Sequence, residues 1–260
     1  MASGVLFRAF RSTPQPFTPT TYSGIIRCMS SSDISSQKVA ARKAAIAALR
    51  LLTASEMVQE SAAITDQLHA TGMVHAAKRM AIYVHCPKLR EVDTTPVLLE
   101  SLERQNARVY VPRVLDKDAN MHFLHINTLN ELETVPPFGI REPTVEYADG
   151  SKREDINEII APVDLVVMPG LAFTEDGKRL GRGGGYYDKF LAKCYERAAE
   201  NGWSPPLLVA LAFRAQFMED VPCDEHDQPV DIIVSADGVR YVTADSRKRA
   251  EELVAAVNQQ

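Results

Sequence analysis

The stretch Gly177–Asp188, GKRLGRGGGYYD, gathers the residue types that bind phosphate. It contains five glycines, and Lys178, Arg179 and Arg182 place three positive charges near the carboxylate of Asp188. Glycines let several backbone N–H groups converge on an anion without hindrance from Cβ atoms, and the start of a helix adds the positive end of its dipole. We therefore predict a cradle for phosphate groups.

Three familiar phosphate-binding loops do not match this stretch. A P-loop needs Lys and then Ser or Thr after its last glycine, but Gly185 is followed by Tyr186. The dinucleotide fingerprint Gly-x-Gly-x-x-Gly would start with Gly181 and Gly183, yet Tyr186 stands where its third glycine should be. The sequence also lacks the His-Arg-Asp and Asp-Phe-Gly triplets of protein kinases. The stretch is therefore a phosphate site of another type.

The plain alternative is that the glycines only permit a tight turn between a strand and a helix. Three consecutive glycines, 183–185, stand before two tyrosines and a carboxylate. Each glycine costs about 0.5–1 kcal/mol of backbone entropy relative to alanine. Because a turn does not need three of them in a row, we favour the ligand-binding interpretation.

Two helices are predicted before the first strand. Residues 36–52 are rich in the strong helix formers Ala, Leu, Lys and Arg. Lys38 and Arg42 are four positions apart, so they lie on the same face of this helix. Thr53 and Glu56 form the capping-box signature of a second helix, which we expect to run to about His69.

A strand, a helix and a second strand are predicted next. Met80–His85 is a short apolar run rich in strand-forming residues, and apolar residues recur at helical spacing over 97–102. Ala107–Val111 has the composition of a second strand, and we expect Pro112 to end it. This order predicts a βαβ unit and a largely parallel sheet.

The rest of the chain continues the alternation. Residues 129–162 are expected to form a long loop with a short helix over 129–133, and Asp164–Met168 is expected to form a buried strand before the glycines, which open a helix. Three further strands and a closing helix are predicted at 207–212, 230–234, 240–243 and 245–257. We predict one α/β domain over 36–257, with three layers and a mostly parallel central sheet between helices, as in Rossmann-like folds.

Composition excludes several classes of protein. The 260 residues carry a net charge of −5, which offers no general attraction for nucleic acid. No segment has the roughly 20 apolar residues that a membrane span requires. The four cysteines are too sparse for a disulfide framework or a thiolate metal site. We expect small-molecule ligands, no nucleic-acid or membrane partner, and a monomer.

The N-terminus has the composition of an organellar transit peptide. Arg8, Arg11 and Arg27 lie in a context rich in Ser and Thr, and no acidic residue precedes Asp33. We predict a transit peptide over 1–32 and import into the mitochondrial matrix, with the plastid as the alternative destination. The other alternative is a tail without a targeting function.

These motifs together resemble the 5-formyltetrahydrofolate cyclo-ligase family, also called methenyltetrahydrofolate synthetases. The resemblance rests first on Met168–Phe173 and Gly177–Asp188, and it spans roughly residues 36–235. Further family segments follow in order along the chain: Lys38-x-x-x-Arg42, Glu91–Thr94, Val111–Arg113, Val221-Pro, and His226-Asp227 with Val230-Asp231.

The resemblance implies a reaction and a set of residues for it. The expected activity is the cyclisation of 5-formyltetrahydrofolate, as a polyglutamate, to 5,10-methenyltetrahydrofolate with ATP as co-substrate and Mg²⁺ as cofactor, releasing ADP and phosphate. Asp188 and Asp227 are the implied Mg²⁺ ligands. The implied ATP-binding residues are Lys38, Arg42, Arg179, Gly181, Arg182, Gly183, Gly184, Gly185, Tyr186 and Tyr187. The implied folate-binding residues are Tyr83, Val84, Glu91, Phe138, Arg182, Gly183, Gly184, Gly185 and Tyr186.

The sequence departs from the family pattern at one position, and two other functions are alternatives to the cyclo-ligase reaction. Some relatives carry lysine at the position of Gly184, and Lys178 or Arg182 is the expected substitute for that charge. A folate-storage or phosphate-sensing protein would keep the pocket without turnover, but it would not need both Asp188 and Asp227. A sugar-phosphate isomerase would need a carboxylate or histidine base beside the glycines and no ATP.

Overall fold

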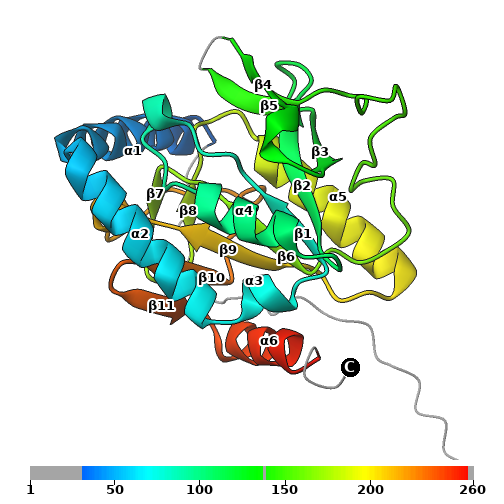
Figure 1. Cartoon of the computed structure of the whole chain (residues 1–260). Helices are drawn as coiled ribbons and strands as arrows, with labels where there is room; N and C mark the ends of the chain where they lie inside the picture. Colours follow the sequence, from blue (N-terminus) through cyan, green and yellow to red (C-terminus); the bar gives the residue numbers. More distant parts are fainter. Residues whose placement is uncertain (1–30, 137–138, 257–260) are drawn as a thin grey trace, which may run out of the picture.

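The structure is a computed structural model that describes residues 31–136 and 139–256. The first half of the chain alternates helices and strands (Figure 1). Its elements are α1 (Ser31–Leu51), α2 (Ala54–Ala70), α3 (Met73–Ala76), β1 (Arg79–Ile82), the 3-10 turn η1 (Pro87–Leu89), α4 (Thr95–Glu103), β2 (Arg108–Val114), β3 (Met121–Ile126), the turn η2 (Leu129–Glu131), β4 (Leu132–Val135) and β5 (Ile140–Pro143).

The second half contains the glycine stretch and completes the sheet. Its elements are β6 (Leu165–Met168), β7 (Ala172–Phe173), β8 (Arg179–Leu180), α5 (Tyr186–Asn201), β9 (Leu207–Leu211), the turn η3 (Arg214–Gln216), β10 (Ile232–Ser235), β11 (Gly238–Tyr241) and α6 (Ala244–Ala255). Among the described residues, none of these helices combines the length and apolarity that a membrane span needs.

A seven-stranded sheet in the order β11-β10-β9-β6-β1-β2-β3 forms the centre of the molecule. The inner strands β10, β9, β6, β1 and β2 are parallel, and the two edge strands β11 and β3 are antiparallel to their neighbours. The predicted βαβ unit is present as β1, α4 and β2. The predicted α/β fold with a mostly parallel sheet is therefore confirmed.

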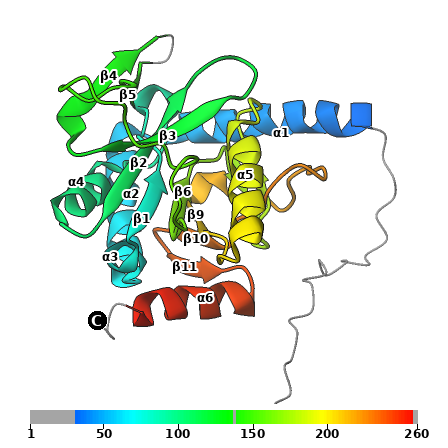
Figure 2. The same cartoon turned by 90° about the vertical axis from the view of Figure 1, so that its right-hand side faces the viewer.

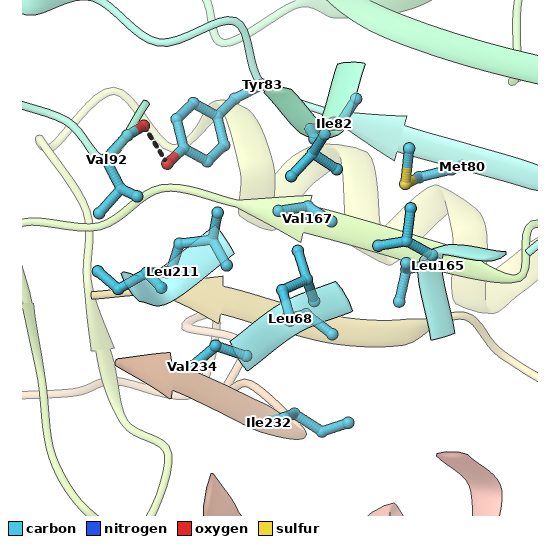
Figure 3. Packing of buried hydrophobic residues seen from close by; sticks show 14 of the residues in the cluster. Leu68, Met80, Ile82, Tyr83, Val92, Leu165, Val167, Leu211, Ile232 and Val234 are labelled. Atoms are coloured by element: carbon cyan, nitrogen blue, oxygen red, sulfur yellow. Dashed lines mark hydrogen bonds between the residues drawn. The ribbon is translucent and has the colours of Figure 1, made fainter. Parts of the chain in front are cut away.

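Both faces of the sheet are buried at its centre, which explains why β6 and β9 are continuously apolar. Side chains alternate between the faces, so Ile82 packs in the cluster beneath α2, α3, α4 and α6, while its neighbour Ala81 packs in the cluster beneath α5. Figure 3 shows the first cluster, where Leu68 from α2 lies among side chains of the strands. Figure 2 shows α1 lying across one end of the sheet, close to the start of α5.

Two local predictions are confirmed in detail. Thr53 caps α2 by accepting a hydrogen bond from the Glu56 amide, and the Glu56 carboxylate accepts one from the Thr53 amide, which completes the capping box. Gly185 stands at the start of α5, so the glycine stretch does open a helix.

Two other predictions were wrong. Strand β2 continues through Pro112 to Val114, because pairing with β1 ends at Tyr110 and the proline removes no hydrogen bond from the parallel ladder. The segment 129–162 is not one long loop, because β4 and β5 pair as an antiparallel hairpin. Their sequences LETV and IREP have apolar residues only at their two ends, so they lack the apolar alternation that marks a half-buried strand.

Candidate functional site

The topology of the sheet indicates where a ligand would be expected to bind. Strands β1 and β6 are neighbours, but the chain leaves β1 toward β2 on one side, while β9 and β10 extend the sheet beyond β6 on the other side. Ligands of open α/β sheets bind outside the carboxyl ends of strands at such a switch point. The segment with Tyr83, Val84 and Glu91 follows β1, and the segment that leads to the glycine stretch follows β6.

The glycine stretch presents bare backbone at this switch point. Gly183 and Gly185 have φ of +98° and +69°, values that side chains with a Cβ atom rarely allow. The amino end of α5 has no side-chain cap, so its first-turn N–H groups and the positive end of its dipole are available to an anion. Gly183 and Gly185 thus leave bare backbone beside the start of α5, and the phosphate cradle stays a prediction.

Arg179 lies buried beneath the cradle and faces Asp188. Its Nη2 donates to Asp188 Oδ1 at 2.7 Å, and its guanidinium carbon lies 5.8 Å from the centre of the Tyr187 ring. Only 5% of Arg179 is exposed, and its Nε has no hydrogen-bond partner among the described residues. A buried guanidinium with an unpaired donor is costly unless a ligand or a water satisfies it.

Helix α1 contributes two cations to the same site. Lys38 Nζ donates to Asp224 Oδ2 at 2.7 Å and also to Asp227, and the residue is only 8% exposed. Burial alone would lower the pKa of Lys38, but hydrogen bonds and charges from the two aspartates outweigh it and raise the pKa. Arg42, on the same helix face as predicted, donates from Nε to the Gly181 carbonyl at 3.0 Å.

Arg42 and Arg179 lie close to the backbone of Gly183 and Gly181, where any other residue would have a side chain. A Cβ atom on Gly183 would lie 3.1 Å from the Arg42 guanidinium carbon, and one on Gly181 would lie 3.1 Å from Arg179 Nη1. Both contacts are tighter than ordinary packing, so with side chains at these positions the two guanidinium groups would have to shift by a few tenths of an ångström.

The two predicted metal ligands lie on neighbouring segments. The amide of Gln228, next to Asp227, donates to Asp188 Oδ1 at 3.3 Å. Each aspartate is paired with a cation, Asp188 with Arg179 and Asp227 with Lys38. Over residues 31–136 and 139–256, no group of three or more His, Cys, Asp or Glu is arranged to hold a metal by itself.

Glu91 connects the segment after β1 with the glycine stretch. Its Oε2 accepts from the Cys86 amide at 2.9 Å, and its Oε1 lies 3.5 Å from Arg182 Nε. Arg182 also donates to the Leu89 carbonyl. Burial raises the pKa of Glu91, against the opposing effects of the Cys86 amide and Arg182. The site therefore holds a carboxylate whose charged form is poorly solvated.

Replacing Glu91 by glutamine should stabilise the folded protein near neutral pH. A raised folded-state pKa means that ionised Glu91 costs stability above its unfolded pKa, and that this cost disappears once the carboxyl is protonated at low pH. Urea unfolding at neutral and at acidic pH measures the effect. Glu91→Gln should be the more stable protein only at the higher pH. If the two proteins were equally stable at both pH values, the raised pKa of Glu91 would be wrong.

The aromatic residues differ in their placement. Tyr83 is buried, and its hydroxyl donates to the Val92 carbonyl at 2.9 Å, so it supports the segment that carries Glu91 (Figure 3). Burial raises the pKa of Tyr187, which packs edge-on against Phe123. Val84 lines a cavity beside the site. Phe138 lies outside the described residues.

The structure also clarifies the position of Gly184. The Tyr186 ring lies where a side chain at 184 would begin, 2.5 Å from a Cβ placed there, and the Tyr186 hydroxyl donates to the Asp116 carbonyl at 2.8 Å. Neither expected substitute for a lysine at 184 is free. Lys178 pairs with Asp220 at 2.6 Å, and Arg182 contacts the segment of Glu91.

Sequence reasoning missed Asp224 and Arg90. Asp224 shares Lys38 with Asp227, and its amide donates to Asp227 Oδ2 at 2.7 Å. Asp224 stands three residues before the predicted metal ligand Asp227, and this spacing could have indicated that it belongs to the site. Arg90 donates from Nε to the Leu49 carbonyl at 2.7 Å and so joins the end of α1 to the segment of Glu91. No motif in the sequence marks Arg90 as a residue of the site.

Comparisons with known proteins point to one family. The sequence model of the 5-formyltetrahydrofolate cyclo-ligase family matches residues 34–236. The Arabidopsis thaliana protein named 5-formyltetrahydrofolate cyclo-ligase, mitochondrial, is 38% identical over 213 residues, which cover 80% of this chain and 76% of that protein. The Mus musculus 5-formyltetrahydrofolate cyclo-ligase is 30% identical over 191 residues, covering 73% of this chain and 88% of the mouse protein.

A solved structure agrees with the fold as well. The structure of Aquifex aeolicus 5,10-methenyltetrahydrofolate synthetase is similar with a TM-score of 0.61 and 30% identity, and the match covers 79% of this chain and 92% of that one. The family sequence model, which matches residues 34–236, spans the glycine stretch, Lys38, Glu91 and both predicted metal ligands. The chain therefore belongs to the 5-formyltetrahydrofolate cyclo-ligase family and is a ligase of folate metabolism.

Proposed function

We propose that this enzyme cyclises 5-formyltetrahydrofolate to 5,10-methenyltetrahydrofolate at the expense of ATP, releasing ADP and phosphate. One observation carries the proposal: Arg42 and Arg179 approach the glycine stretch before α5 from two parts of the chain, and Lys38 lies on the same helix as Arg42. Such a cluster of cations and N–H groups suits a triphosphate. The segment of Glu91 touches the cradle through Arg182, so a second substrate can bind beside the phosphates.

The reaction needs activation of a poor electrophile. The formyl carbon on N5 is an amide carbon, and its nitrogen donates electrons into the carbonyl. The formyl oxygen attacks the γ-phosphorus, an O–P bond forms, and the bond from the γ-phosphorus to ADP breaks. N10 then attacks the activated carbon and loses its proton, and the C–O bond to phosphate breaks to leave the methenyl bridge. Positioning and charge stabilisation account for most of what the protein supplies to such a transfer.

The residues of the site fit these tasks. Lys38 and Arg42 on α1 would hold the phosphates from one side, and the glycine N–H groups would hold them from the other side. Arg179, whose Nε is unpaired, would face the charge that moves with the γ-phosphoryl group. The buried Glu91 carboxylate would accept hydrogen bonds from N–H groups of the pterin ring, which would compensate for its poor solvation.

Asp188 and Asp227 fit Mg²⁺, which takes one or two carboxylates and completes its shell with phosphate oxygens and water. They are oxygen donors on neighbouring segments, and the described residues provide no further ligand cluster. Bound there, Mg²⁺ would offset the negative charge of the phosphates. Arg179 and Lys38 form ion pairs with these two carboxylates.

The absorbance of the methenyl product tests the proposal directly. Purified enzyme with 5-formyltetrahydrofolate should form the product only when ATP and Mg²⁺ are both present, with one ADP and one phosphate released per product. A protein that only stores folate would bind the substrate and form no product. Product formation without ATP would also overturn the proposal.

We also propose that residues 1–32 direct the protein to the mitochondrial matrix and that residues 36–257 are the catalytic domain. The family match starts at residue 34, and the Arg-rich, acid-poor composition of the preceding residues supports a targeting role. A fluorescent protein that carries residues 1–32 should enter mitochondria. Uptake by plastids instead would support the alternative destination.

A chain that begins at Ser31 should retain full activity. It keeps all of α1, including Lys38 and Arg42, and loses only the segment assigned to targeting. We expect its kcat/KM to lie within about twofold of that of the full chain, because no proposed ligand contact is removed. Steady-state assays of the two proteins side by side measure this ratio. A large loss of activity would show that the N-terminal residues belong to the catalytic domain.

A further inference from the structure

The segment 86–92 after β1 forms a closed turn that fixes Glu91. The Arg90 amide donates to the Pro87 carbonyl at 3.0 Å, and the Cys86 amide donates to the Glu91 carboxylate at 2.9 Å. Arg90 has φ of +55°, in the left-handed region that a residue with a Cβ atom adopts only at a cost. Such a conformation persists only where the surrounding structure stabilises it.

The guanidinium of Arg90 reaches the carboxyl end of α1. Its Nε donates to the Leu49 carbonyl at 2.7 Å, and its Nη2 donates to the Leu52 carbonyl. Carbonyl groups at the end of a helix lack intrahelical partners, and a cation there also interacts favourably with the helix dipole. Arg90 thereby fastens the end of α1 to the residue directly before Glu91.

The same helix carries the cations that we propose for the nucleotide. Helix α1 has 21 residues and includes both Lys38 and Arg42. Arg42 donates to the Gly181 carbonyl at 3.0 Å, and Leu49 follows it by about two helical turns. Because one hydrogen-bonded helix holds both residues, a ligand that fixes Arg42 also fixes the carbonyl that Arg90 binds.

We propose that Arg90 is a positioning residue that couples the binding of the two substrates. Phosphates that fix α1 would also fix Arg90, and Arg90 would hold the turn in the conformation in which Glu91 receives the pterin. The proposal rests on the function proposed above and deepens it, because it names the residue through which the two parts of the site affect each other. Each substrate should therefore bind more tightly when the other is bound, and by the same factor.

Arg182 forms a second link between the same two parts of the site. Its Nη2 donates to the Leu89 carbonyl, and its Nε lies 3.5 Å from Glu91 Oε1. Because we propose that Arg182 itself contacts both substrates, its removal would weaken binding directly. Arg90 directs its guanidinium at main-chain carbonyls of α1, so its replacement tests the coupling without removing a proposed ligand contact.

The test measures how much each substrate changes the affinity for the other. Titration calorimetry gives the Kd of 5-formyltetrahydrofolate with and without Mg²⁺ and a non-hydrolysable ATP analogue. In the unaltered enzyme the analogue should lower this Kd about fivefold or more, and 5-formyltetrahydrofolate should lower the Kd of the analogue by the same factor. In Arg90→Gln both ratios should fall to about twofold or less. An unchanged ratio in Arg90→Gln would assign the coupling to Arg182 and overturn the proposal.

Two further variants separate the guanidinium from the shape of the turn. Glycine adopts positive φ without strain, so Arg90→Gly keeps the turn and removes the link to α1. It should lose the coupling as Arg90→Gln does. Arg90→Lys keeps the charge without the two-pronged geometry, so it should recover part of the ratio. If Arg90→Gly keeps the full ratio, only the conformation of the turn matters and the proposed link is wrong.

Arg104 provides a matched control. It is half-buried like Arg90, and its guanidinium also donates to carbonyls at the end of a helix, those of Val74 and Ala77 at the end of α3. Helix α3 precedes β1, so this contact lies at the opposite end of the strand from the proposed site. Arg104→Gln should keep the ratio of the unaltered enzyme. If it lowers the ratio as much as Arg90→Gln does, a general loss of stability explains the effect and the proposal fails.

A product assay beside the calorimetry separates this proposal from the proposed function. The binding measurements require no turnover, whereas product formation tests the reaction. If the unaltered enzyme forms no product but shows the coupling, and Arg90→Gln abolishes it, the reaction is wrong and the role of Arg90 stands. If the unaltered enzyme forms product and the two substrates bind independently, the reaction stands and the role of Arg90 is wrong.

Discussion

Replacing Asp188 by asparagine is expected to lower kcat by about 10²-fold or more, the loss typical when a charge that acts on the transition state is removed. The change keeps the shape of the side chain and removes the charge. Without it, the proposed site loses one of its two Mg²⁺ carboxylates and the partner that orients Arg179. Assays at increasing Mg²⁺ measure the effect, because weaker metal binding should move the Mg²⁺ optimum upward.

Asp188→Asn should also lower the stability of the folded protein. Arg179 is buried, and Asp188 is its ion-pair partner. Asparagine still offers an oxygen acceptor but leaves the buried guanidinium without a counter-charge, so the free energy of unfolding should fall by about 1–3 kcal/mol. The double variant Arg179→Gln with Asp188→Asn should recover much of that stability, because no buried charge is left unpaired, and it should remain inactive.

Asp220→Asn is the matched control for this experiment. Asp220 also pairs with a cation of the glycine stretch, Lys178, but its side chain is 74% exposed. Exposed pairs contribute about 0–1 kcal/mol, so this variant should keep both its stability and its activity. Near-normal turnover of Asp188→Asn at ordinary Mg²⁺ would show that Asp188 is not a metal ligand.

The fold could be predicted wherever the signals are local. The capping box at Thr53 and the glycines before α5 determine structure within a few residues, so the sequence shows them directly. The hairpin of β4 and β5 escaped prediction because its strands pair with each other and the two central residues of each strand are polar. Strand β2 continues past Pro112 because of where its pairing with β1 ends, which depends on tertiary structure.

In the candidate site, too, only features determined by nearby residues could be predicted. The cradle and Asp188 are contiguous with the glycines, so their types and spacing indicate them. Lys38 and Asp224 meet although they are 186 positions apart, and no local pattern indicates which carboxylate a helical lysine contacts. The cavity lined by His85 and Arg141 likewise forms only when the β4–β5 hairpin lies over the end of β1. Residues that act through distant partners therefore become visible only in the folded chain.

Arg179 and Lys38 should differ in the kinetic constant that they affect. Arg179 lies beneath the cradle with an unpaired Nε, so it is placed to meet charge that develops as the γ-phosphoryl group moves. Lys38 reaches the site from α1 and is held by Asp224 and Asp227, so it is placed to hold the nucleotide before reaction. A contact made only in the transition state lowers kcat, whereas a contact made equally in both states lowers affinity.

Arg179→Ala should therefore lower kcat and kcat/KM by about 10²-fold or more, and Lys38→Ala should mainly raise KM for ATP. Steady-state kinetics with ATP varied at saturating 5-formyltetrahydrofolate decides between the two roles. Because removal of Arg179 leaves Asp188 without its ion pair, Arg179→Lys is measured as well; it keeps the charge and should retain the fold. If Arg179→Ala leaves kcat unchanged, the glycine stretch only binds the nucleotide, and the catalytic charge belongs to Arg182 or to the metal.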